Sequence, residues 1–121
     1  MLSTLLFAPM IARASDALIF AAVYECHADE VNRDMVEACK RTYPELSAIA
    51  SDALTNWRAR NGDRAKQNMA ACEPAAFQAQ AVKVKESIRS GFLAQMRERG
   101  KSACVVALEQ LSTGSGAMDL K

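Results

Sequence analysis

Apolar residues recur along most of this chain at the three- and four-residue spacing of an amphipathic helix. The clearest example runs from about Ala75 to Arg99, between Pro74 and Gly100. Its apolar stripe consists of Phe77, Ala81, Val84, Ile88, Phe92 and Met96. The pattern predicts a long helix there that packs with one face against the rest of the protein.

The preceding part of the chain predicts two further long helices. The first extends from Ser15, a favourable N-cap, to about Thr42, although the polar stretch 27–34 leaves room for a break. Its apolar positions are Phe20, Tyr24, Val31, Met35 and Cys39. The second begins at Pro44, which suits the first turn of a helix. Its apolar face consists of Leu46, Ile49, Ala50, Ala53, Leu54 and Trp57.

The end of the second helix is marked by Asn61-Gly62, which predicts a left-handed C-cap. A short helix from Asp63 to Cys72 follows, unless Gly62 is only a kink inside one longer helix. A fourth main helix is expected after Ser102 as its N-cap. Its apolar positions are Cys104, Val105, Leu108 and Leu111. The predicted fold is all-α, an antiparallel bundle of four main helices plus a short helix.

Residues 1–14 predict a signal peptide. Their apolar run ends in Ala12-Arg13-Ala14, the small-x-small pattern that signal peptidase cleaves. We expect the start of this peptide to be truncated, because Met1-Leu2-Ser3 carries no basic residue. The alternative is a buried N-terminal helix of a cytoplasmic protein. No membrane span is predicted, since Arg13 and Asp16 interrupt the apolar run before the roughly 20 residues that a span needs.

The other end of the chain predicts a flexible C-terminal tail over residues 112–121, because Ser112 to Gly116 is rich in serine and glycine. Residues 15–111 then form a single helical domain. The full chain has 15 basic and 14 acidic residues, and removal of Arg13 with the leader leaves 14 of each. This balance gives no electrostatic reason to expect binding of nucleic acid or of an anionic membrane.

Four cysteines in an exported chain predict two disulfides. Cys26 and Cys39 are 13 residues apart on one predicted helix, which is roughly 20 Å at 1.5 Å per residue and too far for a bond that needs Cα atoms within about 7 Å. Each therefore pairs with Cys72 or Cys104. We favour Cys26–Cys72 with Cys39–Cys104, because the second helix returns the chain toward Cys26, and the crossed pairing is the alternative.

Other chemistry of these residues is disfavoured by spacing. A metal site from Cys26, His27 and Cys39 lacks a C-x-x-C pair, and neighbouring helical residues point about 100° apart. Haem attachment and thioredoxin-like redox catalysis lack their motifs, so no cofactor is predicted. His27, the one histidine, has no nucleophile elbow or catalytic-cysteine context and is interpreted as part of an exposed polar turn. We therefore expect a protein that is not an enzyme.

The string Trp57-Arg58-Ala59-Arg60-Asn61 is the most distinctive in the chain. One interpretation is a core tryptophan at a helix end, followed by cations that suit the helix dipole. The other is a partner-binding site of Trp57, Arg58 and Arg60, because tryptophan and arginine are enriched at binding hot spots. The exposure of Trp57 distinguishes the two.

Several of these residues also carry a family resemblance. Cys39-x-x-x-Tyr43-Pro44, Trp57-x-x-Arg60-Asn61, the late Cys104 and the closing Met118-Asp119-Leu120 resemble a group of small, uncharacterised, exported four-cysteine helical proteins of Gram-negative bacteria. The chain is more loosely similar to the periplasmic lysozyme-inhibitor family. It lacks that family's cysteine shortly after Arg60 and its Asn-x-Cys start, so no inhibitory residue is carried over.

These observations lead us to expect a periplasmic or secreted protein that binds another protein of the cell envelope, such as an inhibitor or immunity-type factor would. A carrier of a small apolar ligand or lipid is the alternative, because an alanine-rich bundle with six methionines could enclose an apolar cavity. A small hydrolase acting through Glu25, Asp29 or Glu30 ranks lowest. A flat exposed patch around Trp57 would favour the first function, an apolar pocket the second, and a convergent carboxylate pair in a cleft the third.

Overall fold

The computed structural model describes the backbone of residues 2–72 and 75–121 and the side chains of residues 18–72 and 78–121. Its helices are α1 (Leu2–Thr42), the 3₁₀ helix η1 (Pro44–Leu46), α2 (Ser47–Ala71), α3 (Ala75–Arg99) and α4 (Lys101–Thr113). The described residues contain no strand, so the predicted all-α class is confirmed. The signal peptide expected at residues 1–14 remains a prediction, because the side chains there lie outside the described residues.

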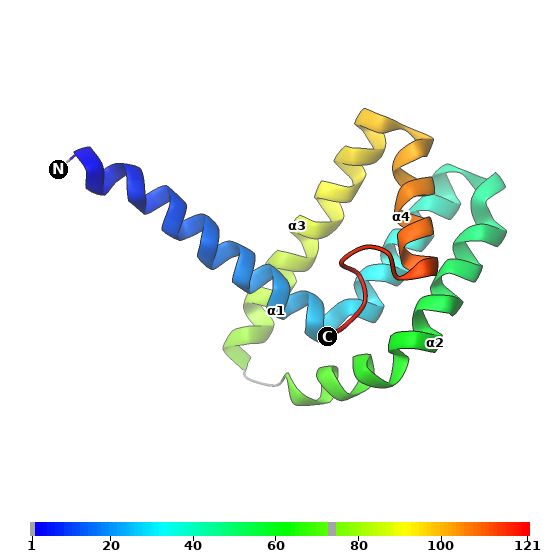
Figure 1. Ribbon diagram of the computed structural model, residues 1–121, viewed down its shortest axis with the longest axis horizontal. Helices are drawn as coiled ribbons and strands as arrows, with labels where there is room; N and C mark the ends of the chain where they lie inside the picture. Colours follow the sequence, from blue (N-terminus) through cyan, green and yellow to red (C-terminus); the bar gives the residue numbers. More distant parts are fainter. Residues whose placement is uncertain (1, 73–74) are drawn as a thin grey trace.

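Figure 1 shows the helices returning on one another, with short connections between α1 and α2 and between α3 and α4. Consecutive helices run antiparallel, whereas α3 follows the direction of α1: Lys85 pairs with Glu30, and Arg89 and Leu93 lie farther along beside Ala38. Each helix packs against two others, in the cyclic order α1, α2, α4, α3. The result is a small bundle around one apolar core.

The bounds of α3 are those that the sequence predicts, whereas the bounds of the other helices differ from the prediction. α3 spans the predicted Ala75–Arg99 and stops at Gly100, whose φ of 66° is left-handed. α1 begins at Leu2 rather than after Ser15, and it contains a kink at His27. The N-cap of α4 also differs from the prediction. It is Gly100 and not Ser102, whose hydroxyl donates to the Arg99 carbonyl.

The prediction that the second helix ends near Asn61 is wrong. Gly62 is not in the left-handed region, and α2 continues through it to Ala71, so the alternative of one longer helix is correct. The short extra element lies instead at η1, where Pro44 starts a 3₁₀ turn. A glycine inside a helix lowers its stability by about 0.5–1 kcal/mol without ending it, because packing along the rest of the helix outweighs this cost.

The core contains side chains from every helix. Trp57 is fully buried at its centre, and Leu108 and Leu111 of α4 are fully buried beside it. Many of the other buried members are alanines, which let the helices approach closely; they include Ala28, Ala50, Ala53, Ala103 and Ala107. Three positions of the predicted apolar faces are exposed and lie outside the core: Phe20 is 38%, Ile49 57% and Val105 44% exposed.

Two disulfides join α1 to the residue that follows α2 and to α4. Cys26 bonds to Cys72 with a Cα–Cα distance of 6.0 Å, and Cys39 bonds to Cys104 with a Cα–Cα distance of 5.8 Å. The favoured pairing is therefore confirmed. Because Cys72 precedes α3 and Cys104 follows it, the disulfides tie both flanks of α3 to α1.

Candidate functional site

Trp57, in the segment 57–61 of α2, lies in the hydrophobic core. Trp57 has no exposed surface, and its indole Nε1 donates to the Met118 carbonyl at 2.9 Å. The hypothesis that an exposed Trp57 anchors a partner together with Arg58 and Arg60 is therefore wrong, because the tryptophan belongs to the core. Its two arginines point to different neighbours, Arg58 to Asp29 and Arg60 to Asp119.

Arg60 joins three parts of the structure. Its guanidinium donates to the carbonyls of Leu111 and Ser112, each at 2.6 Å, and so satisfies two of the free carbonyls at the end of α4. The same guanidinium forms a bidentate ion pair with the two carboxylate oxygens of Asp119, at 3.0 and 3.1 Å. This ion pair and the Asn61 amide hold the pKa of the Asp119 carboxyl below its ordinary value.

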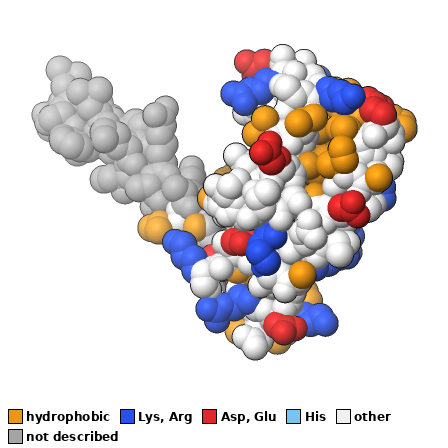
Figure 2. Space-filling model, turned by 45° about the vertical axis from the view of Figure 1, so that its right-hand side comes forward, with side chains coloured by type: hydrophobic (Ala, Val, Ile, Leu, Met, Phe, Trp, Pro, Cys, Tyr) orange, Lys and Arg blue, Asp and Glu red, His pale blue; other side chains and the backbone are white. Residues whose placement is uncertain are grey.

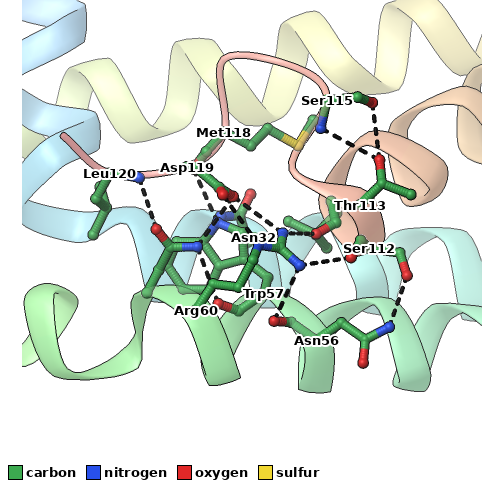
Figure 3. A network of polar contacts seen from close by, with 12 residues as sticks. Asn32, Asn56, Trp57, Arg60, Ser112, Thr113, Ser115, Met118, Asp119 and Leu120 are labelled. Atoms are coloured by element: carbon green, nitrogen blue, oxygen red, sulfur yellow. Dashed lines mark hydrogen bonds and ion pairs between the residues drawn. The ribbon is translucent and has the colours of Figure 1, made fainter.

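Residues 114–121, which we call the C-terminal strap, lie across α1 and α2 (Figure 3). The Met118 carbonyl accepts hydrogen bonds from Trp57 and from the Tyr24 hydroxyl, and the Leu120 amide donates to the Asn61 side chain at 2.8 Å. Burial raises the pKa of Tyr24 to about 12, so its hydroxyl stays a donor. A flexible tail was expected over residues 112–121, and the structure instead has helix to Thr113 followed by an anchored segment.

His27 also departs from expectation. The sequence suggested an exposed polar turn, but the His27 side chain is only 9% exposed and lies at the kink of α1. Its Nδ1 is 3.8 Å from a Glu30 carboxylate oxygen, and its buried Nε2 has no hydrogen-bond partner in the described part of the chain. Burial, followed by the Lys85 ammonium, lowers the pKa of His27 below its ordinary value, so the imidazole is neutral at pH 7. The interpretation of His27 as an exposed residue is wrong.

A metal site of Cys26, His27 and Cys39 is contradicted by the disulfides. Both sulfurs are bonded to other cysteines, and a disulfide sulfur supplies no thiolate to a metal. Of the carboxylates considered for hydrolysis, Asp29 is bound by Arg58 at 2.8 and 3.0 Å and Glu30 by Lys85 at 3.1 and 3.3 Å. The Arg58 guanidinium holds the pKa of Asp29 below its ordinary value, the opposite of the raised pKa that a general acid needs.

An apolar groove of about 200 Å³ lies between α1 and α3, and we call it the α1–α3 groove. Its apolar lining consists of Tyr24, Val31, Met35, Ala38, Ile88, Phe92, Leu93 and Met118. Its polar lining consists of Asn32, Asp34, Lys85 and Arg89. Met118 belongs to the C-terminal strap, so the strap forms part of the wall. Most α3 residues on the side of the groove, such as Phe92, are only half-buried, so α3 does not cover the apolar surface of α1 completely.

A second apolar area lies on α2 and α4. Ile49 is 57% exposed, and Val105 and Val106 are 44% and 47% exposed. Ile49 and Val105 line a shallow hollow of about 250 Å³. Figure 2 shows hydrophobic side chains gathered in the upper part of the visible face. Such a patch on a small protein is a candidate contact surface.

Comparison with known proteins gives no relative. No family model, no curated protein and no solved structure matches the chain. Among the described residues, no helix is both long enough and apolar enough to cross a membrane.

The groove and the strap were missed by the sequence interpretation. Two of the groove residues on α3, Ile88 and Phe92, belong to the predicted apolar stripe, but a stripe alone does not show whether the helix that packs against it covers it completely. The sequence carried a weak signal for the strap. Met118 and Leu120 are apolar residues on either side of an aspartate, and a buried Trp57 needs a hydrogen-bond acceptor for its indole N–H.

Proposed function

We propose that this protein is an exported, disulfide-stabilised binding protein that holds the apolar part of a small ligand in the α1–α3 groove. The observation that carries the proposal is the groove itself, which combines eight apolar side chains with four polar ones. Ligand sites commonly have this composition, with an apolar lining that provides affinity and a few polar groups that orient the ligand. This is the carrier function expected from an apolar pocket.

Export to the periplasm or the medium is part of the proposal. The two disulfides support it, since such bonds persist in oxidising compartments and are rare in the cytosol. The small-x-small pattern at residues 12–14 supports it independently. The proposal contains no catalytic step.

The size of the groove limits the ligand. A volume of about 200 Å³ has room for about seven methylene-sized groups, at roughly 30 Å³ each. At about 0.8 kcal/mol for each buried CH₂ group, complete burial would provide about 5–6 kcal/mol. That free energy corresponds to a dissociation constant of about 0.1 mM. We therefore expect weak binding of short alkyl chains and stronger binding of a ligand that also uses the polar groups.

A series of straight-chain alcohols from butanol to decanol tests this function by calorimetric titration of the oxidised protein. Affinity should rise about fourfold for each added methylene and level off near seven carbons, where the groove is full. Val31→Phe should weaken binding at least fivefold, because Val31 lines the groove. The matched control Val106→Phe changes an exposed α4 position and should leave binding unchanged. Affinity that is independent of chain length would contradict the proposal.

A protein partner is the second candidate function, and the exposed α2–α4 area favours it. Ile49 and Val105, which line the shallow hollow, present an apolar surface that a partner could cover. A photo-crosslinking residue at position 105 should then give one discrete product in envelope extract. The same residue at position 82, which is an exposed valine on α3, serves as the control. Equal products from both positions would count against a specific partner at this face.

A further inference from the structure

The kink of α1 faces the second half of α2 across a pocket of about 550 Å³, which we call the kink pocket. His27, where φ is −125° and ψ is 22°, interrupts the helix beside it. The volume lies within the range of small-molecule sites, about 300–1,000 Å³. This pocket shares no lining residue with the α1–α3 groove and is independent of the function proposed above.

The charges around the kink pocket leave an excess of positive charge. Asp29 is bonded to Arg58, and the cations Arg33 and Lys66 also act on the Asp29 carboxylate. Three cations thus surround one carboxylate. The second α1 acid that lines the pocket, Glu30, already pairs with Lys85 of α3.

One further acid, Asp63, lies exposed on the α2 side of the pocket. The lining has three acids and three bases, but Asp29 is paired with Arg58, and Glu30 is paired with Lys85 from outside the lining. The charges that remain are those of Arg33, Lys66 and Asp63, a balance of one positive charge. A monoanion would neutralise this excess, whereas a neutral ligand would not. Arginine and lysine are the side chains that bind carboxylates through hydrogen bonds to the charged oxygens.

The remaining lining suits the organic part of such an anion. Ala65, Met69 and the Cys26 side chain of the disulfide provide an apolar wall. Gly62 also lines the pocket, and a Cβ atom placed there would meet nothing within 4 Å. Packing therefore does not require this glycine, although glycine inside a helix costs stability. The missing side chain keeps the pocket open.

We propose that the kink pocket binds a small organic carboxylate, whose charge lies near Arg33 and Lys66 and whose apolar part contacts Ala65 and Met69. His27 also lines the pocket, at the kink of α1.

Benzoate is the test probe, and benzamide is its neutral control of nearly the same size. Amide NMR spectra of the oxidised, full-length protein should show saturable benzoate-induced shifts at Gly62 and around His27, and no such shifts with benzamide. Arg33→Gln and Lys66→Gln should each weaken benzoate binding about two- to fivefold, the range for partly exposed charge pairs. Lys83→Gln, which changes an exposed α3 lysine, should have no effect.

Gly62→Leu separates occupancy of the pocket from damage to the fold. Leucine has the higher helix propensity, so this variant should be at least as stable as the parent protein. It should nevertheless weaken benzoate binding, because the new side chain occupies part of the pocket. Equal shifts with benzamide would overturn the proposal. Undiminished binding by Gly62→Leu, or by both charge variants, would also overturn it.

Discussion

Replacement of Asp119 by alanine tests whether the C-terminal strap stabilises the folded protein. Asp119 is the acidic residue through which the strap contacts α2, and its carboxylate accepts bonds from Arg60 and Asn61. The substitution removes these bonds and leaves the rest of the strap in the chain. The Asn61 amide keeps one partner, the Trp57 carbonyl at 3.1 Å, so it is not left without a hydrogen bond.

The expected cost follows from the exposure of each bond. The Arg60–Asp119 pair is one-third exposed on both sides, so solvent screens it to about 0.5–1 kcal/mol. The bond to the buried Asn61 adds about 0.5–1 kcal/mol. The total is about 1–2 kcal/mol, which corresponds to a fall in Tm of about 4–10 °C for a domain of this size.

Urea unfolding at pH 7, followed by fluorescence, measures this change directly. Trp57 is the only tryptophan, and its indole donates to the strap, so the probe reports the affected region. Asp52→Ala, at an exposed position of α2, is the control and should cost less than about 0.5 kcal/mol. If Asp119→Ala is as stable as this control and leaves the Trp57 emission unchanged, the strap does not pack as described.

Three further predictions concern other parts of the structure. Replacing Cys39 and Cys104 together by alanine should cost about 4 kcal/mol, because the bond closes a loop with a sequence separation of 65, and a loss under 1 kcal/mol in urea unfolding would refute this estimate. Since burial lowers the pKa of His27, the unfolded chain binds a proton that the folded chain does not; stability should therefore fall as the pH drops below about 6.5, and His27→Gln should remove this dependence between pH 5 and 7 in thermal melts. Arg60→Ala should lower stability by about 1–2 kcal/mol, because two α4 carbonyls lose their donor. Arg58→Ala should cost less than about 1 kcal/mol, because its ion pair is 44% and 39% exposed and contacts no helix end; an equal cost would contradict the different roles of the two arginines.

The sequence predicted those features that depend on neighbouring residues, such as the bounds of α3 and the pairing of the cysteines. The helix predicted after Pro74 in the sequence has the observed bounds of α3, and it stops at Gly100 because glycine adopts a left-handed φ at little cost. Helix geometry also excluded a Cys26–Cys39 bond, and the return of the chain along the second helix favoured the observed pairing over the crossed one. These inferences needed only the rise per residue and the direction of the chain.

The features that sequence reasoning missed depend on tertiary contacts. Gly62 does not end α2, because packing on both sides of it sustains the helix. The burial of Trp57 became certain only with the fold, and so did the strap that satisfies its indole. A Ser/Gly-rich segment suggests a flexible tail from composition alone, yet the acceptors and donors beyond it match Asn61 and Arg60. The groove likewise depends on how α3 packs against α1, which the sequence pattern of either helix does not determine.

Transfer of magnetisation between heptanol protons and the methionine methyl groups tests the proposed ligand groove most directly. Met35 and Met118 line the α1–α3 groove, while Met96 is buried in the core and lines neither the groove nor the kink pocket. With methyl-labelled methionine in the oxidised protein, we expect intermolecular NOEs from heptanol to Met35 and Met118 and none to Met96. The absence of NOEs to Met35 and Met118 at saturating heptanol would contradict the proposed ligand groove.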